Sequence, residues 1–271
     1  MKRAILITSA LALTALGQPL AAADTQKLVL TGSSTIAPLM LEIAKRFEAR
    51  NPGTRVDVQS GGSSRGVADA RTGLAQIGMV SRALKTEERD LTAYTIAMDG
   101  VSIIVHKSNP IQTMSDAQVK AIYTGQIRNW RDLGGPELPI TVVNKAEGRS
   151  TLELFTTYFA MKNSDIKAQV VIGENQQGIK TVAGIPGAIG YVSIGTAEYE
   201  EQHGAKIKTL TLGGVAATLK NVREARFPLS RPLNLVTHGA PQGIAKQLIE
   251  FARSKDVYDL IEAQYFVPVA R

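Results

Sequence analysis

Two kinds of hydrophobic pattern alternate along the chain. Short apolar runs predict strands at 27–30, 56–59, 77–80, 101–105, 140–143, 188–194 and 233–236. Amphipathic segments predict helices over 36–47, 66–74, 115–122, 152–159 and 243–252. Strands that alternate with helices in this way indicate an α/β fold with parallel strands in its sheet.

Capping residues mark some of the helix boundaries. Ser115 is a favourable N-cap for the helix over 115–122. Thr86, followed by two glutamates, has the pattern of an N-cap with acidic residues in the first turn. The turn signal at 51–53, which reads Asn-Pro-Gly, ends the first helix.

The first 23 residues have the pattern of a secretory signal peptide. Lys2 and Arg3 give a basic start, an uncharged apolar run follows over 4–16, and three alanines end the segment at Ala23. The run of about 13 residues is too short to span a bilayer comfortably, although a retained membrane anchor is the alternative. We expect cleavage after Ala23 and a soluble periplasmic chain. No Cys follows the run, so we expect no lipid anchor.

The residues from Asp24 onward suffice for one large domain or two medium ones with real cores. No long Pro- or Ser-rich linker divides them, which two lobes joined by crossing strands would explain. We assign 24–104 and 233–271 to lobe 1, and 105–232 to lobe 2.

Charge and rare residue types exclude several classes of protein. The chain has 31 Lys and Arg against 24 Asp and Glu, but no basic stripe or aromatic platform, so nucleic-acid binding is not expected. Loss of the signal peptide lowers the net charge from +7 to +5, enough for weak attraction of anions. Cys is absent and the three His are far apart in sequence. We therefore expect no disulfide, no metal site and no cofactor.

Three segments rich in Gly, Ser and Thr follow strands and precede helices. They lie at 32–35 (GSST), 61–66 (GGSSRG) and 148–151 (GRST). Each alone could be an ordinary helix cap. Together they offer unpaired helix N–H groups, hydroxyl donors and glycines that let the backbone approach a ligand. Micromolar affinity corresponds to about 8 kcal/mol, and a charge-assisted hydrogen bond contributes roughly 1.5–3 kcal/mol, so several loops must converge on one oxyanion.

Cations lie beside these segments in the sequence: Arg65, Arg82, Lys145 and Arg149. Each could be a solvated surface charge. Lys145 and Arg149 flank a Gly/Ser/Thr loop and are the stronger candidates for ligand contact. Glu147 lies between them, and we expect it to orient Lys145 by pairing with it; the alternative is a solvated loop carboxylate.

An enzyme motif also matches. The segment 62–66 fits the G-x-S-x-G pattern of hydrolases, with Ser64 as nucleophile and His238 as a downstream base. No oxyanion-loop signature of the HGGG type precedes it. We therefore expect a binding protein and not an enzyme.

Longer motifs cover nearly the whole chain after the signal peptide. They are 31–39 (TGSSTIAPL), 61–66 (GGSSRG), 77–82 (IGMVSR), 98–101 (MDGV), 122–130 (IYTGQIRNW), 132–135 (DLGG), 147–151 (EGRST), 187–192 (GAIGYV) and 227–233 (FPLSRPL). Their order resembles the phosphate-binding proteins of Pst-type ABC transporters, which are type II periplasmic solute-binding proteins. The resemblance implies two α/β lobes that bury the ligand in a cleft at the hinge.

The resemblance also implies the ligand contacts. Ser34, Thr35 and the amide of Ile36 would bind the anion from the first loop, and Ser63 and Ser64 from the second. Arg149, Ser150 and Thr151 would close from the other lobe. Trp130 would belong to the core of lobe 2.

Three positions depart from well-known members of the family. Those members have an Asp, which accepts the proton of monohydrogen phosphate, where this chain has Ser81. They have Arg where this chain has Lys145, and Ser where it has Arg149. A carboxylate disfavours fully deprotonated sulfate, so its absence weakens the basis for selecting phosphate. Lys also lacks the bidentate fork of Arg.

These observations predict an extracytoplasmic solute-binding protein that captures inorganic phosphate. We expect a monomer that delivers phosphate to a membrane-embedded ABC permease. The alternatives are binding of another oxyanion, such as sulfate or arsenate, or of a small organic phosphate. The Ser64-dependent hydrolase is the third possibility.

Overall fold

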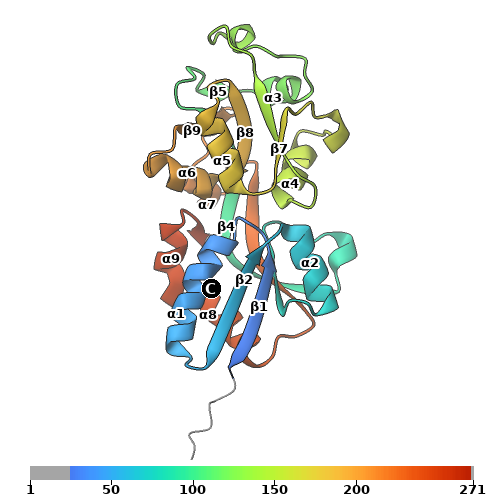
Figure 1. The fold of residues 1–271 in the computed structure, drawn as a ribbon, viewed down its shortest axis with the longest axis vertical. Helices are drawn as coiled ribbons and strands as arrows, with labels where there is room; N and C mark the ends of the chain where they lie inside the picture. The colour runs from blue at the N-terminus through green and yellow to red at the C-terminus, as the bar shows by residue number, and fades with distance from the viewer. Residues whose placement is uncertain (1–24, 270–271) are drawn as a thin grey trace, which may run out of the picture.

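The computed structural model describes residues 25–269. The predicted signal peptide and its cleavage point lie outside the described residues. Figure 1 shows an elongated molecule with two α/β bodies, one above the other, which we call lobe 1 (lower) and lobe 2 (upper).

Lobe 1 contains the two ends of the described chain. Its elements are β1 (Gln26–Gly32), α1 (Ala37–Arg50), β2 (Thr54–Ser60), α2 (Ser63–Thr72), β3 (Ile77–Val80), the 3-10 helix η1 (Thr86–Glu88), the first part of β4 (Leu91–His106), β11 (Ser230–His238), α8 (Gly243–Ala252), η4 (Lys255–Val257), α9 (Tyr258–Ala263) and β12 (Val267–Pro268). Strand β1 pairs in parallel with β2 and β3, as the alternation of elements predicted.

Lobe 2 contains the middle of the chain. Its elements are the second part of β4, β5 (Thr113–Met114), α3 (Asp116–Tyr123), η2 (Trp130–Leu133), β6 (Thr141–Lys145), α4 (Ser150–Tyr158), η3 (Asn163–Asp165), β7 (Val170–Ile172), α5 (Asn175–Gly184), β8 (Ala188–Ser193), α6 (Ile194–Gln202), β9 (Ile207–Thr209), β10 (Thr211–Leu212) and α7 (Leu219–Arg223). Strand β6 pairs in parallel with both β7 and β8.

Strands β4 and β11 connect the lobes. The first part of β4 pairs antiparallel with β11, with Gly100 opposite Ser230. From Val101 onward β4 pairs instead with β8 in lobe 2. The strand order is therefore continuous, β2-β1-β3-β11-β4-β8-β6-β7, although it spans two bodies. Our assignment of 24–104 with 233–271 to one lobe, and of 105–232 to the other, stays a proposal.

Each lobe has its own hydrophobic core on both faces of its sheet. In lobe 1, α1 buries the predicted apolar stripe, including Leu39, Ile43 and Phe47, against β1, α8 and α9. Helix α2 covers the other face. In lobe 2, Trp130 is fully buried with α3 and α4, and its indole Nε1 donates to the carbonyl of Gly187 at 3.0 Å, which confirms its predicted place in the core.

Several predicted boundaries are correct and others are wrong. The helix over 243–252 has the predicted bounds, and Ser115 caps its helix by accepting from the backbone N–H of Gln118. The prediction of Thr86 as an N-cap is wrong: Lys85 occupies the N-cap position, and Thr86 is the first residue of a three-residue 3-10 helix.

Strand β4 begins at Leu91, ten residues before the predicted strand. The added residues include polar and charged positions, so their own pattern does not predict a strand; they form one because they pair with β11. Helices α5 and α6 were not predicted, since their sequences contain few apolar residues.

Candidate functional site

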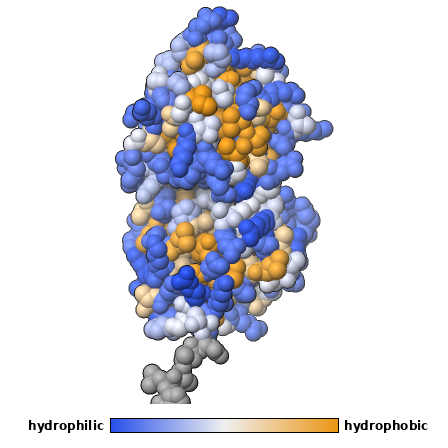
Figure 2. All heavy atoms as spheres, viewed as in Figure 1, coloured by the Kyte–Doolittle hydropathy of each residue, from blue (hydrophilic) through white to orange (hydrophobic). Residues whose placement is uncertain are grey.

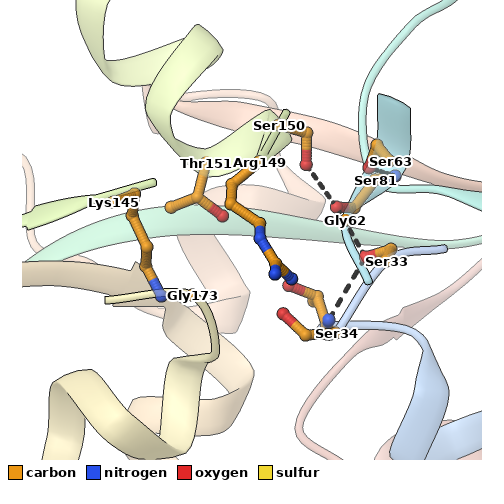
Figure 3. Close-up of a pocket in the computed structure, with 11 residues that line it drawn as sticks. Ser33, Ser34, Gly62, Ser63, Ser81, Lys145, Arg149, Ser150, Thr151 and Gly173 are labelled. Atoms are coloured by element: carbon orange, nitrogen blue, oxygen red, sulfur yellow. Dashed lines mark hydrogen bonds between the residues drawn. The ribbon is translucent and has the colours of Figure 1, made fainter. Parts of the chain in front are cut away.

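The loops that follow strands of the two lobes meet around one small cavity at the hinge. Figure 3 shows its lining side chains, with Arg149 directed toward Ser34 of lobe 1 and Lys145 directed toward Gly173. The cavity is lined by Ser33, Ser34, Thr35, Gly62, Ser63, Ser81, Lys145, Arg149, Ser150, Thr151 and Gly173. The carboxyl ends of parallel strands gather at one edge of a sheet, which brings loops distant in sequence together.

The cavity is buried and narrow. Lys145 is 2% exposed and Ser81 is 1% exposed. Its free volume is about 10 Å³. The side chains therefore enclose a space for a compact group.

Two helices begin at the cavity, and both begin earlier than the sequence predicted. Helix α2 starts at Ser63 and α4 at Ser150, so the hydroxyl residues form the first helical turns. The backbone turns into α2 at Gly62, where φ is +98°, and a Cβ there would lie 2.7 Å from the carbonyl oxygen of Gly148. The partial positive charge of both helix N-termini therefore lies at the cavity, as anion binding requires.

A chain of serine hydroxyls joins the two lobes. Ser33 Oγ accepts from the N–H of Thr35 and donates to Ser81 Oγ at 2.8 Å. Ser81 Oγ lies 2.6 Å from Ser150 Oγ across the cleft, and either atom can be the donor. Ser63 Oγ accepts from the N–H of Ser81. One hydroxyl hydrogen of the Ser81–Ser150 pair and the hydrogen of Ser63 are thus left for a ligand.

Two cations lie on the lobe 2 side of the cavity. Lys145 Nζ donates to Asn175 Oδ1 at 2.9 Å. Burial, with the nearby Arg231, lowers the pKa of Lys145 to about 7. Arg149 Nη1 donates to Glu174 Oε1 at 2.7 Å. Glu147 does not orient Lys145, contrary to our prediction, because it is exposed and accepts instead from Asn163.

The cavity has an excess of donors. Among residues 25–269, no Asp or Glu lines it. Ser81, which stands where the resemblance suggests an aspartate, is central to the serine chain. The lining can therefore donate hydrogen bonds to an anion from both lobes, without a carboxylate to repel it.

Eight of the eleven predicted residues line the cavity. They are Ser34, Thr35, Ser63, Ser81, Lys145, Arg149, Ser150 and Thr151. The other three do not. The Ile36 amide lies 3.4 Å from Ser33 Oγ, Ser64 Oγ donates to Glu153, and Arg82 is paired with Glu88 and Glu153.

The sequence interpretation missed three lining residues and the groups behind them. Ser33, Gly62 and Gly173 line the cavity without having been predicted to bind. Behind it, Arg231 and Asp99 form an ion pair that is 1% and 0% exposed at its side chains. The sequence did contain a signal for this pair: Asp99 and Arg231 are charged residues within the largely apolar segments 98–101 and 227–233. A charge in such a place is seldom buried unless it is paired.

The predicted hydrolase alternative requires His238 beside Ser64 as its base. Ser64 Oγ donates to Glu153 Oε1 at 3.2 Å. His238 is the last residue of β11, eight residues beyond the hinge residue Ser230. At about 3.3 Å per strand residue, it lies roughly 26 Å along the strand from the hinge. Ser64 and His238 are therefore not arranged as nucleophile and base.

Comparison with known proteins places the chain among binding proteins. Residues 18–256 match the family model described as a PBP superfamily domain. The phosphate-binding protein PstS of Bacillus subtilis is 29% identical over 247 residues, which cover 89% of this chain and 80% of that protein. The phosphate-binding protein PstS of Borreliella burgdorferi is 25% identical over 257 residues, which cover 91% of this chain and 91% of that protein.

Two solved structures are similar over their whole length. A putative phosphate ABC transporter substrate-binding protein with bound phosphate, from Clostridium perfringens, has a TM-score of 0.84 and 30% identity, over 90% of this chain and 100% of that chain. An ABC-type phosphate transport receptor from Vibrio cholerae has a TM-score of 0.74 and 27% identity, over 89% of this chain and 100% of that chain.

Proposed function

Because this chain belongs to the PBP superfamily, with Pst-type phosphate-binding proteins as its relatives, we propose that it captures inorganic phosphate between its lobes for uptake by an ABC transporter. The two-lobed α/β fold of that superfamily is the fold described above. The observation that carries the proposal is the convergence of buried hydroxyls, helix N-termini and two cations on one cavity. Burying an anion is costly unless its oxygens are hydrogen-bonded, and this lining supplies donors from both lobes.

The ligand contacts follow from the lining. We propose that Ser34, Thr35 and Ser63 bind phosphate from lobe 1, and that Lys145, Arg149, Ser150 and Thr151 bind it from lobe 2. Ser81 joins the two sets through its hydrogen bonds to Ser33 and Ser150.

We propose that the chain works as an extracytoplasmic monomer that delivers phosphate to a membrane-embedded permease. The names of its relatives and the predicted signal peptide support this role. Between residues 25 and 269, no helix is long and apolar enough to cross a membrane. On the face seen in Figure 2, polar residues border the narrowing between the lobes, while apolar patches lie within each lobe.

The proposed role is binding without chemistry. The relatives are named as binding proteins, and Ser64 donates to Glu153, which is itself tied to Arg82 and Lys85, and not to the predicted base His238.

Calorimetry on refolded, ligand-free protein that starts at Asp24 tests the proposed function. Phosphate, arsenate and sulfate are titrated separately. We expect saturable binding of phosphate with a dissociation constant near or below about 1 μM, because several charge-assisted hydrogen bonds converge on it. Arsenate, which has the same shape and protonation, should compete. Protein that gives no phosphate heat after verified refolding would contradict the proposal.

One observation favours a second class of ligand, fully deprotonated oxyanions such as sulfate. No carboxylate lines the cavity among the described residues, so nothing there repels fully deprotonated sulfate. Equal affinities for sulfate and phosphate in the same titrations would identify a less selective oxyanion-binding protein. Tight binding of phosphate alone would mean that Ser81 and its neighbours select it without an aspartate.

Glu153 joins the lobes outside the cavity, and its neutralisation should speed release of phosphate. This lobe 2 carboxylate contacts Arg82 Nε at 2.8 Å, Lys85 Nζ at 3.1 Å and Ser64 Oγ at 3.2 Å, all from lobe 1. Glu153→Gln removes the charge, while Arg82 keeps its partner Glu88. We expect release about 3- to 10-fold faster in stopped-flow measurements, equivalent to roughly 0.6–1.4 kcal/mol.

Glu137→Gln is the matched control for the Glu153 measurement. Glu137 pairs with Arg131 within lobe 2, on the surface, so its neutralisation should leave the release rate unchanged. Equal rates for Glu153→Gln and the native protein would show that the contact does not hold the lobes together.

A further inference from the structure

We propose that Arg231, in a strand that joins the lobes, is a positioning residue that aims the hydroxyl hydrogens of Thr35 and Thr151 into the cavity when the lobes close. This inference rests on the proposed function, since it concerns how the same cavity recognises phosphate. Within the described chain, the cavity lining includes both threonines but not Arg231. Arg231 therefore acts through them.

Arg231 is held rigidly by a carboxylate. Its Nε and Nη2 donate to Asp99 Oδ2 at 3.1 and 2.8 Å. The other oxygen, Asp99 Oδ1, accepts from Ser193 Oγ at 3.0 Å and from the N–H of Gly195 at 3.3 Å. Both oxygens of Asp99 are thus engaged, and the planar guanidinium has a fixed orientation.

The remaining donors of Arg231 reach the two lobes. Nη2 donates to Thr35 Oγ1 at 3.1 Å, and Nη1 donates to Thr151 Oγ1 at 3.0 Å. Thr35 lies in the loop after β1 of lobe 1, while Thr151 lies in the first turn of α4 in lobe 2. One guanidinium in the connecting strand therefore contacts one ligand-facing hydroxyl from each lobe.

These contacts determine the direction in which each threonine can donate. A hydroxyl has one hydrogen and two lone pairs. Thr35 Oγ1 accepts from Arg231 and also from Asn175 Nδ2 at 3.1 Å, so both lone pairs are used. Its hydrogen has no acceptor among residues 25–269, and the cavity is the direction left. Thr151 Oγ1 accepts from Arg231 alone, and its hydrogen likewise has no acceptor among the described residues, so it is available to a ligand.

Asn175 extends the arrangement across the cleft. Its Oδ1 accepts from Lys145 Nζ, which fixes the amide so that Nδ2 faces Thr35 of the opposite lobe. The donor geometry around Thr35 thus needs both lobes in place. Closure and the orientation of the donors are therefore coupled through Arg231 and Asn175, neither of which lines the cavity.

A double-mutant cycle tests whether Arg231 acts through the threonines. Arg231→Lys keeps a cation near Asp99 but lacks the planar fork whose two terminal nitrogens each reach one hydroxyl. We expect it to weaken phosphate binding about 10- to 100-fold, the range found when partners that orient a bound group are removed. In a Thr35→Val/Thr151→Val background, from which both hydroxyls are gone, we expect the same substitution to change the dissociation constant less than about threefold.

Matched variants separate positioning from a general effect on folding. A Thr35→Ser/Thr151→Ser background keeps both hydroxyls and should keep the full sensitivity to Arg231→Lys. Should Arg231→Lys fail to fold, the cycle is repeated with Arg231→Met/Asp99→Asn, which removes both charges of this buried ion pair. Dissociation constants are measured by equilibrium dialysis with labelled phosphate, which covers weak binding.

The outcomes distinguish this inference from the proposed function. Sensitivity in the native and serine backgrounds, with near insensitivity in the valine background, supports the positioning role. Equal losses in all three backgrounds would overturn it, because Arg231 would then act independently of the threonines. If the native protein does not bind phosphate, the proposed function is wrong, and the inference that depends on it is wrong as well.

Discussion

Replacing Lys145 with methionine is expected to weaken phosphate binding at least about 100-fold near pH 6, which corresponds to about 2.7 kcal/mol. The ammonium group is buried at the cavity, and its hydrogen-bond acceptor in the protein is the neutral Asn175 Oδ1. A bound anion would supply the missing counter-charge. Methionine has a similar length but no charge, so the loss measures the ammonium contribution.

The same residue predicts the pH dependence of binding. In the ligand-free cavity, burial and the nearby Arg231 and Arg149 lower the pKa of Lys145, and Glu174 opposes them, with a result of about 7. An anion favours the charged form, so binding raises this pKa. The contribution of Lys145 is therefore complete below about pH 7 and is lost as the pH rises toward the pKa of the bound state, by up to about tenfold per pH unit. Calorimetry above pH 7 should also show uptake of a proton.

Phosphate itself titrates near neutrality, and burial raises the pKa of Glu198 to about 7. Both effects are present in the native protein and in Lys145→Met, so the difference between their two pH profiles isolates Lys145. Lys246→Met, a change on the exposed face of α8, is the control and should follow the native profile. Parallel profiles for Lys145→Met and the native protein would show that Lys145 does not change protonation on binding.

Asp99→Asn should destabilise the protein by about 3–5 kcal/mol, because it leaves the buried charge of Arg231 without a counter-ion. Asp99 is 0% exposed and Arg231 is 1% exposed, so solvent cannot replace the lost partner. Urea unfolding followed by circular dichroism reports the whole chain, and the fluorescence of Trp130 reports the core of lobe 2. A lower midpoint with an unchanged slope indicates lost stability.

Two variants check the cause of this destabilisation. Asp259→Asn breaks an ion pair with Arg46 in which Asp259 is 63% exposed, and it should cost at most about 1 kcal/mol. Arg231→Met/Asp99→Asn removes the buried charge and should recover most of the stability lost in Asp99→Asn. It should not recover phosphate affinity, since both threonines lose their donor. A destabilisation below about 1 kcal/mol for Asp99→Asn would contradict the account of a costly unpaired charge.

Prediction from the sequence succeeded where the signal is local. The helix over 243–252 and the buried stripe of α1 were predicted because apolar spacing within one helix decides its buried face. Prediction failed for the first ten residues of β4, which pair with β11 more than 120 positions later in the chain. The pattern of a single segment does not contain that partner.

The candidate site shows the same division. Ser63 and Ser64 are neighbours in one loop, but successive helical residues point about 100° apart. Ser63 therefore faces the cavity, while Ser64 donates to Glu153. Arg82 has the sequence context of a ligand contact, but Glu88 and Glu153 hold it outside the cavity.

Local sequence patterns are enough to predict the alternating strands and helices and several Gly/Ser/Thr loops able to bind an oxyanion. Those features depend on contacts within a few residues: apolar periodicity, helix capping and the freedom of glycine. The folded chain was needed to show which hydroxyls face the common cavity, that Asn175 and not Glu147 holds Lys145, and that Arg231 contacts a threonine from each lobe. Hydrogen bonds and ion pairs require the right direction at about 3 Å, and these partners come within that range only when the two lobes fold and close.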